Sequence, residues 1–161
     1  MRAAGTRDAE MAEAFRRFVR ERGGSVEEVA HRQPVTETCT SHTYDRLSFA
    51  GYEQLPVRVT TWLHSGDSVL YLNIPLSALT AYGSVVPDAL VDGLVEACRA
   101  VHASVPLEAA VIGEEARVAA ALLDLWGSGQ GPKRGNAGTL WPEADGELTW
   151  FPDAPISLAG V

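Results

Sequence analysis

Two cysteine–histidine pairs are the first residues whose types and spacing suggest chemistry. Cys39 is followed by His42, and Cys98 is followed by His102. Two cysteines and two histidines can hold a tetrahedral structural zinc ion. However, residues three apart on an extended strand point to opposite faces, and Cys98 stands in an apolar helical stripe, where a free cysteine packs as a small hydrophobic residue. We therefore predict no metal site and no cofactor.

Nucleophilic catalysis is a second kind of chemistry that the residue types allow. A histidine such as His42 or His64 could activate Cys39 or Ser41. The G-x-S-x-G sequence of a nucleophile elbow is absent. An enzyme or a small-ligand-binding protein nevertheless stays open as the alternative function. Its pocket would form if the polar faces of two predicted strands, 35–49 and 57–64, were adjacent, and would be lined by His42, Tyr44, Arg46, Trp62 and His64.

The glycine-rich segment 127–138 has the composition of a phosphate-binding loop. It reads GSGQGPKRGNAG and includes Lys133 and Arg134. Nucleotide loops carry a Gly-Lys-Ser/Thr sequence and follow a strand, whereas this segment lacks that sequence and follows a predicted helix. We expect a surface loop that holds no nucleotide.

The excess of negative over positive charge is confined to the second part of the chain. The net charge of the whole chain is −8; residues 1–60 carry nine arginines and nine acidic residues, whereas residues 61–161 carry four basic and twelve acidic residues. An acidic surface repels the phosphates of nucleic acids and attracts a basic protein. The charge pattern therefore favours a basic protein as partner and argues against nucleic acid.

Tryptophans lie within this acidic part, and tryptophan is enriched at the centres of protein interfaces. Whether Trp141 and Trp150 belong to the core or to the surface is left open by the pattern, because a hairpin has two faces. The predicted partner-binding residues are Trp141, Glu143, Asp145, Glu147 and Trp150.

The overall pattern is that of a protein-binding domain rather than an enzyme. Small size, acidity and the lack of a catalytic motif resemble, in type, the bacterial immunity proteins that occlude a toxin, although no aligned motif carries the likeness. The presence of a single lysine among the 13 basic residues is typical of a GC-rich bacterial genome. We expect a non-catalytic domain, an immunity or inhibitor protein, that occludes a basic partner. The oligomeric state stays open.

The elements that must position these residues follow from hydrophobic periodicity and from the residues that end helices and strands. Glycines follow the first predicted helix, and a Ser25–Glu28 capping box predicts that a second helix begins there. In chain order, the sequence predicts helices over 8–22 and 25–32, a strand over 35–49, a hairpin of 57–63 and 69–76, a helix over 87–103, a strand over 107–112, a helix over 114–126 and a hairpin within 139–152.

The order α-α-β-β-β-α-β-α-β-β predicts an α+β fold, with a mostly antiparallel sheet and helices mainly on one face. One parallel pairing is expected between 69–76 and 107–112, through a right-handed crossover. The length of 161 residues fits a single domain, 1–161, whose ends 1–7 and 153–161 are expected to fray. No apolar run is long enough for a membrane span, and no secretory signal is apparent, so we expect a cytoplasmic protein.

Overall fold

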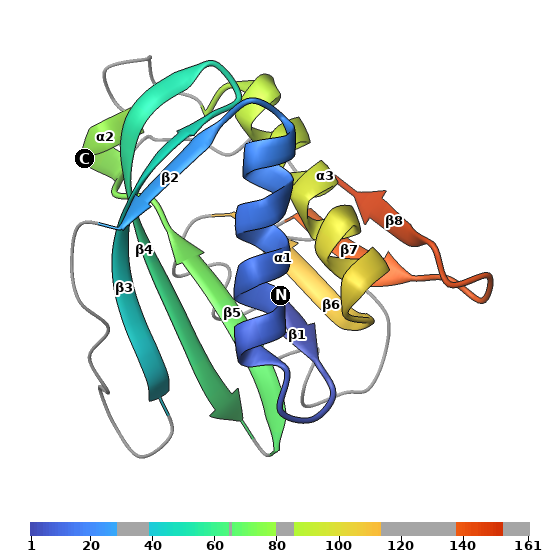
Figure 1. Cartoon of the computed structure of the whole chain (residues 1–161). Coiled ribbons are helices and arrows are strands. Elements are labelled where there is room, and N and C mark those ends of the chain that lie inside the picture. The colour runs from blue at the N-terminus through green and yellow to red at the C-terminus, as the bar shows by residue number, and fades with distance from the viewer. Residues whose placement is uncertain (29–38, 65, 80–85, 114–137, 153–161) are drawn as a thin grey trace.

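An eight-stranded sheet covered by two long helices forms the framework of the molecule (Figure 1). The computed structural model describes residues 1–28, 39–64, 66–79, 86–113 and 138–152, with the backbone alone at 28, 39–45, 62–64, 76 and 77. In chain order the elements are β1 (Arg2–Ala3), α1 (Asp8–Glu21), β2 (Ser25–Glu28), β3 (Cys39–Phe49), β4 (Tyr52–His64), β5 (Asp67–Asn73), α2 (Leu76–Leu79), α3 (Asp88–Ser104), β6 (Leu107–Ile112), β7 (Gly138–Pro142) and β8 (Leu148–Phe151).

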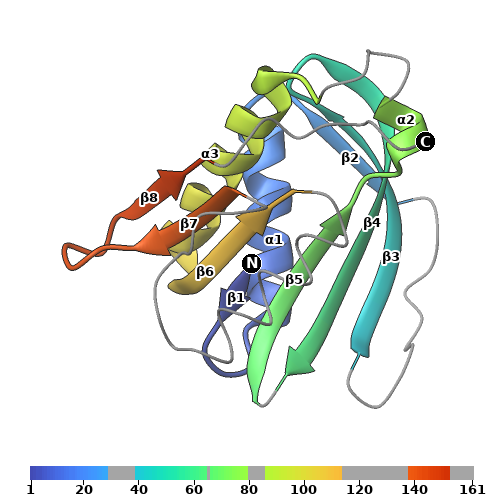
Figure 2. The same ribbon diagram turned by 180° about the vertical axis from the view of Figure 1, so that it is seen from behind.

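The strands lie in the order β2-β3-β4-β5-β1-β6-β7-β8, and every described pair is antiparallel. Both long helices cover the same face of this sheet (Figure 1), and Figure 2 shows the sheet from the opposite side. The predicted α+β fold, with a mostly antiparallel sheet and helices mainly on one face, is confirmed. The order of the elements matches the prediction only roughly.

The two long helices form because their apolar residues recur at helical spacing. In α1 the predicted inner stripe is buried, and Gly23 with φ +76° follows the helix, as a residue in the left-handed region often does. In α3 the buried residues include Leu90, Cys98 and Val101. Phe18 of α1 meets Phe49 of β3 edge to face, with ring centroids 5.9 Å apart. The core therefore lies between these helices and the sheet.

Residues 25–28 form strand β2, so the helix predicted from the capping box is wrong at these positions. Ser25 to Glu28 pair with Ser48 to Asp45 of β3. Gly24 approaches the backbone of Ser48 so closely that no Cβ atom would fit between them. Pairing with β3 supplies the backbone hydrogen bonds that a helix would otherwise have made, and this tertiary interaction overrides a local capping signal.

The expected parallel pairing of β5 with β6 is also wrong, because β1 lies between them. Arg2 is opposite Val69 of β5 on one side and Ala109 of β6 on the other, and both pairings are antiparallel. The strands β5 and β6 thus run in the same direction but bond to β1 instead of to each other. Arg2 and Ala3, within the segment 1–7 that was expected to fray, are therefore paired on both sides in the middle of the sheet.

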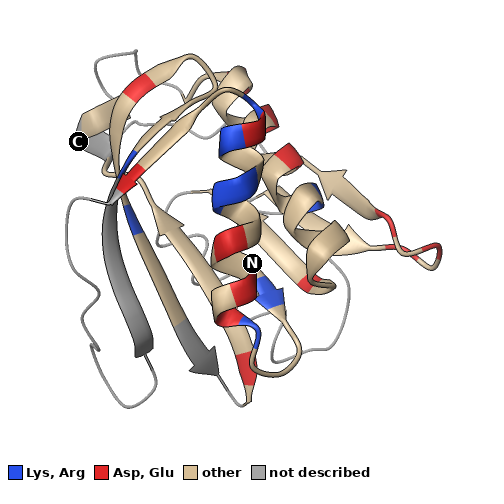
Figure 3. Ribbon diagram, in the orientation of Figure 1, with Lys and Arg blue, Asp and Glu red and all other residues tan. Residues whose placement is uncertain are grey.

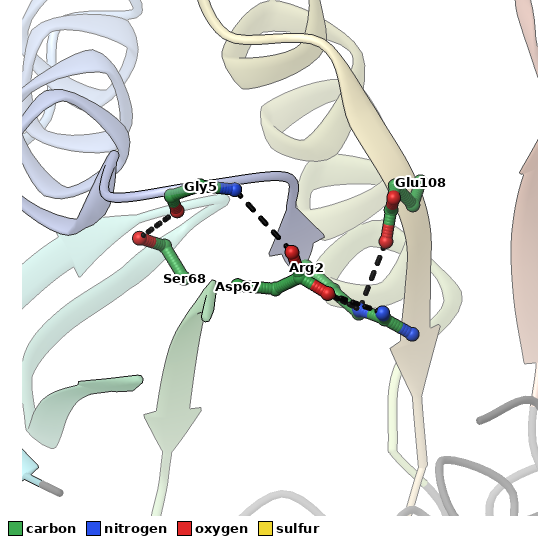
Figure 4. A network of polar contacts seen from close by, with 5 residues as sticks. All are labelled: Arg2, Gly5, Asp67, Ser68 and Glu108. Atoms are coloured by element: carbon green, nitrogen blue, oxygen red, sulfur yellow. Dashed lines mark hydrogen bonds and ion pairs between the residues drawn. The ribbon is translucent and has the colours of Figure 1, made fainter. Parts of the chain in front are cut away.

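Polar contacts fasten the segment around β1 to its neighbours (Figure 4). The Arg2 guanidinium forms an ion pair with Asp67, and its Nε lies 2.9 Å from a carboxylate oxygen of Glu108. The Ser68 hydroxyl, fully buried, donates to the Gly5 carbonyl at 2.7 Å. These contacts join β5 and β6 across β1, and they explain how so short a strand is held there.

Three predictions concern residues outside those that the structure describes: the helix over 114–126, the glycine-rich loop over 127–137 and the frayed tail over 153–161. Gly138, which the sequence places at the end of that loop, begins β7. Among the described residues, no helix has the length and apolar character needed to cross a membrane.

Candidate functional site: the β7–β8 hairpin

The predicted partner-binding residues lie on the β7–β8 hairpin, whose existence and turn are confirmed. Strand β7 pairs with β8 in a register that sets Leu140 opposite Trp150 and Trp141 opposite Thr149. Beyond the strands, the Glu143 N–H donates to the Glu147 carbonyl at 2.9 Å. The turn between them ends at Gly146, whose φ of +85° is the left-handed conformation that three-residue hairpin loops require.

Strand alternation gives this hairpin an inner and an outer face. Leu140, Leu148 and Trp150 share the inner face, where the two leucines are buried and Trp150 packs against the core. The outer face carries the half-buried Trp141 and Thr149, and it also carries Phe151 opposite Thr139, which is buried. The 143–147 hydrogen bond continues the same alternation, so that Glu143 and Glu147 extend the outer face toward the turn.

Trp141 and Trp150 therefore do not share a surface. A Cβ atom on Gly138 would overlap the six-membered ring of Trp150, so this ring lies directly over the glycine on the inner face. Both tryptophans are half-buried, but Trp150 packs against the core, whereas Trp141 lies on the outer face. The sequence-based prediction grouped the two tryptophans because of their type and their closeness along the chain. Neither property indicates which face of the hairpin a residue occupies.

Phe151 is the outer-face residue that the sequence interpretation missed. Its exposed fraction is 39%, and it is the single large hydrophobic residue described as exposed. It stands opposite Thr139, diagonally across from Trp141. The position of the turn could have revealed Phe151, because the turn residues fix the register of the hairpin. The register decides whether Trp150 or Phe151 faces outward.

The turn of the hairpin concentrates acidic residues (Figure 3). Glu143, Asp145 and Glu147 are exposed, and within the described part of the chain no arginine or lysine forms an ion pair with them. Some acidic residues elsewhere are paired, such as Glu13 with Arg20 and Glu96 with Arg22 at 2.6 Å. Asp145 does have a local role, because its carboxylate accepts the Glu147 N–H at 3.0 Å.

Helix α3 holds the hairpin from the inner side. The Arg99 Nε donates to the Leu148 carbonyl at 3.3 Å, and the His102 Nε2 lies 2.8 Å from the Gly146 carbonyl at the turn. The far end of the hairpin nevertheless extends beyond α3 (Figure 1). The outer face and the turn are thus presented on a supported projection from the sheet.

The two cysteine–histidine pairs that were considered as zinc ligands are not brought together as far as the structure describes them. Cys98 is buried in the core, and burial raises the pKa of its thiol to about 11, which disfavours the thiolate that a metal ion needs. Both ring nitrogens of His102 are engaged with backbone groups. Among the described residues, no cluster of potential metal ligands is found. The side chains of Cys39 and His42 lie outside the described part.

Of the alternative pocket, the structure describes only the pairing of the two strands that would carry it. Strands β3 and β4 are indeed neighbours, with His42 opposite Thr60 and Tyr44 opposite Arg58. The side chains of the pocket residues His42, Tyr44, Trp62 and His64 fall outside those that the structure describes, so the pocket stays a prediction. Arg46 is exposed and donates to the Gln54 side chain at 3.4 Å.

Comparison with known proteins gives no relative from which a function could be transferred: no family model matches the chain, and no curated protein or solved structure matches it either. The function must therefore be argued from the hairpin itself.

Proposed function

We propose that this chain is a non-catalytic protein-binding domain that docks a basic partner protein on the outer face and turn of the β7–β8 hairpin. One observation carries the proposal: a single hairpin face joins aromatic side chains, Trp141 and Phe151, to carboxylates that lack a basic partner among the described residues. Aromatic groups supply apolar contact area at an interface centre, and unpaired carboxylates attract a cationic surface and speed its approach.

An immunity or inhibitor protein is the class of protein that suits such a surface best. Proteins of this kind act by occupying the surface of another protein, so they need a supported projection of complementary charge and no reacting group. The cytoplasmic location and the bacterial origin expected from the sequence belong to the same proposal.

The test measures the affinity of an oligolysine peptide by isothermal titration calorimetry at low salt. The hairpin variant combines Glu143→Gln, Asp145→Asn and Glu147→Gln; the asparagine oxygen can still accept the Glu147 N–H that holds the turn. The matched control combines Glu21→Gln, Glu53→Gln and Asp92→Asn, three exposed acidic residues for which the structure shows no ion pair. Both variants change the net charge from −8 to −5, because each removes three negative charges.

We expect the hairpin variant to bind oligolysine about tenfold more weakly than the parent chain, because exposed ion pairs contribute roughly 0.2–1 kcal/mol each and about 1.4 kcal/mol corresponds to tenfold. The control variant should lose much less. Trp141→Leu should weaken binding about two- to fivefold through the loss of a cation–π contact of roughly 0.5–1 kcal/mol. If both triple variants lose affinity equally, net charge alone explains the binding and the proposal is wrong.

A further inference from the structure

His102 connects three elements at the place where the hairpin meets α3. It belongs to the last turn of α3 and is half-buried. The backbone N–H of Leu107, the first residue of β6, donates to its Nδ1 at 2.9 Å. Its Nε2 lies 2.8 Å from the carbonyl oxygen of Gly146, in the turn of the hairpin.

These two contacts fix the proton of the imidazole. A backbone N–H can only donate, so the Nδ1 that receives it must carry a lone pair. The proton of the neutral ring is therefore on Nε2, where it is donated to the Gly146 carbonyl. A doubly protonated imidazole has two N–H groups and no acceptor, so it cannot keep the bond from Leu107.

We propose that His102 positions the acidic hairpin for its partner and makes that binding depend on pH; this inference rests on the function proposed above. In the neutral form, one ring ties the hairpin turn to α3 and to the start of β6. A second proton removes the Leu107 bond. It also places a positive charge beside the hairpin, where it offsets part of the negative charge that attracts a basic partner.

The charges around His102 decide whether acidification weakens or strengthens the binding of a basic partner. The charged groups of the hairpin turn are carboxylates, so a positive charge on the imidazole would offset part of their attraction for a cation. Of the neighbouring cations, Arg99 donates to the Leu148 carbonyl of the hairpin, Arg17 of α1 to the Ser104 hydroxyl, and Arg2 pairs with Glu108 of β6. Among the described residues, none of these three arginines forms an ion pair with the acidic turn. Acidification should therefore weaken the binding of a cationic probe through this histidine.

The first experiment measures the protonation of the His102 ring by nuclear magnetic resonance, in the absence of any partner. The ¹⁵N chemical shifts of His102 near pH 7.5 should show the Nε2–H tautomer, and the amide signals of Leu107 and Gly146 should move with the titration of the same ring. The opposite tautomer, or amides that ignore the titration, would overturn the inference and leave the proposed docking face untouched.

The second experiment measures oligolysine affinity at about pH 7.5 and pH 5.5. The parent chain should bind about two- to fivefold more weakly at the lower pH, because one added positive charge beside the hairpin offsets roughly the contribution of one exposed ion pair. His102→Gln should bind equally at both values, because the amide can accept from Leu107 and donate to Gly146 but cannot titrate. The control His64→Gln, on β4, four strands away from β7, should keep the full pH dependence.

The outcomes separate the two proposals. A pH dependence that survives in His102→Gln overturns the role of His102, even if the hairpin still binds the probe. Unfolding of His102→Gln, checked by circular dichroism, would still leave the ¹⁵N measurement of the parent chain to decide. An equal loss of probe binding in the two triple variants overturns the docking face, whatever the tautomer of His102.

Discussion

The buried thiol of Cys98 should make the folded state less stable in alkaline solution. Its side chain is 3% exposed, and burial raises its pKa from 9.0 to about 11. Below about pH 9 the thiol is protonated in the folded and the unfolded chain. Between about pH 9 and 11 the unfolded chain loses this proton while the folded chain keeps it, so the free energy of unfolding falls.

The size of the effect follows from the pKa difference. One pKa unit between the folded and unfolded states corresponds to about 1.36 kcal/mol, so roughly 2–3 kcal/mol of stability should be lost from this group by pH 11. Other groups titrate in the same range, and Cys98→Ala isolates the contribution of the thiol. At about pH 7 this variant should be less stable by roughly 1–2 kcal/mol, because it leaves a cavity.

Urea denaturation of both chains, monitored by circular dichroism at about pH 7, 9, 10 and 11, gives the two curves. The difference between parent chain and Cys98→Ala should be constant up to about pH 9, should then shrink and should reverse near pH 11. A difference that stays constant across the whole range would refute the argument, since it would mean that the thiol ionises equally well in both states.

Three further substitutions have expected effects on urea denaturation. Gly138→Ala should lower the free energy of unfolding by about 1–3 kcal/mol, because the new methyl group displaces the Trp150 ring; the near-ultraviolet circular dichroism of the tryptophans should change with it. Gln54→Gly should raise the free energy of unfolding by about 1 kcal/mol, because the exposed Gln54 has a φ of +57°. Gly93→Ala should destabilise the protein despite its better helix propensity, because the Cβ would lie 2.9 Å from the Phe49 ring; a higher midpoint would show that the ring moves aside freely.

The elements that the sequence predicted well are those in which local periodicity and burial agree. The inner stripe of α1 and the stripe around Cys98 in α3 are buried as expected. The β4–β5 and β7–β8 hairpins are adjacent in sequence and turn on glycines with positive φ, Gly66 and Gly146. In each case the information lies within a few neighbouring residues, which is the range over which a sequence pattern is informative.

The elements that were missed depend on contacts between distant residues. Strand β1 has only two residues, and its place between β5 and β6 depends on the pairing of Arg2 with acidic residues 65 and more positions away. Strand β2 starts with a residue that also suits a helix cap, and its pairing with β3 decides the outcome. A pattern read along the chain carries no signal for either event.

Only part of the candidate site could be predicted from the sequence. The acidic turn follows from composition, because charged residues at a hairpin tip are expected to be exposed. The aromatic partner of that turn does not follow, since exchanging Trp150 for Phe151 on the outer face takes a shift of one residue in register. Sequence reasoning thus located the hairpin and its charge, whereas the structure assigns the aromatic residue to its face.

The last strand also bears on how a partner could be recognised. The 143–147 hydrogen bond sets the phase of the hairpin, so that the backbone groups of Leu148 and Trp150 point away from β7, on the side where the described strands of the sheet end. Such an edge can capture another strand. Here Arg99 occupies the Leu148 carbonyl, and Pro152, which has no N–H, follows the strand. Strand addition at β8 is therefore disfavoured, which leaves the side chains of the outer face as the better surface for a partner.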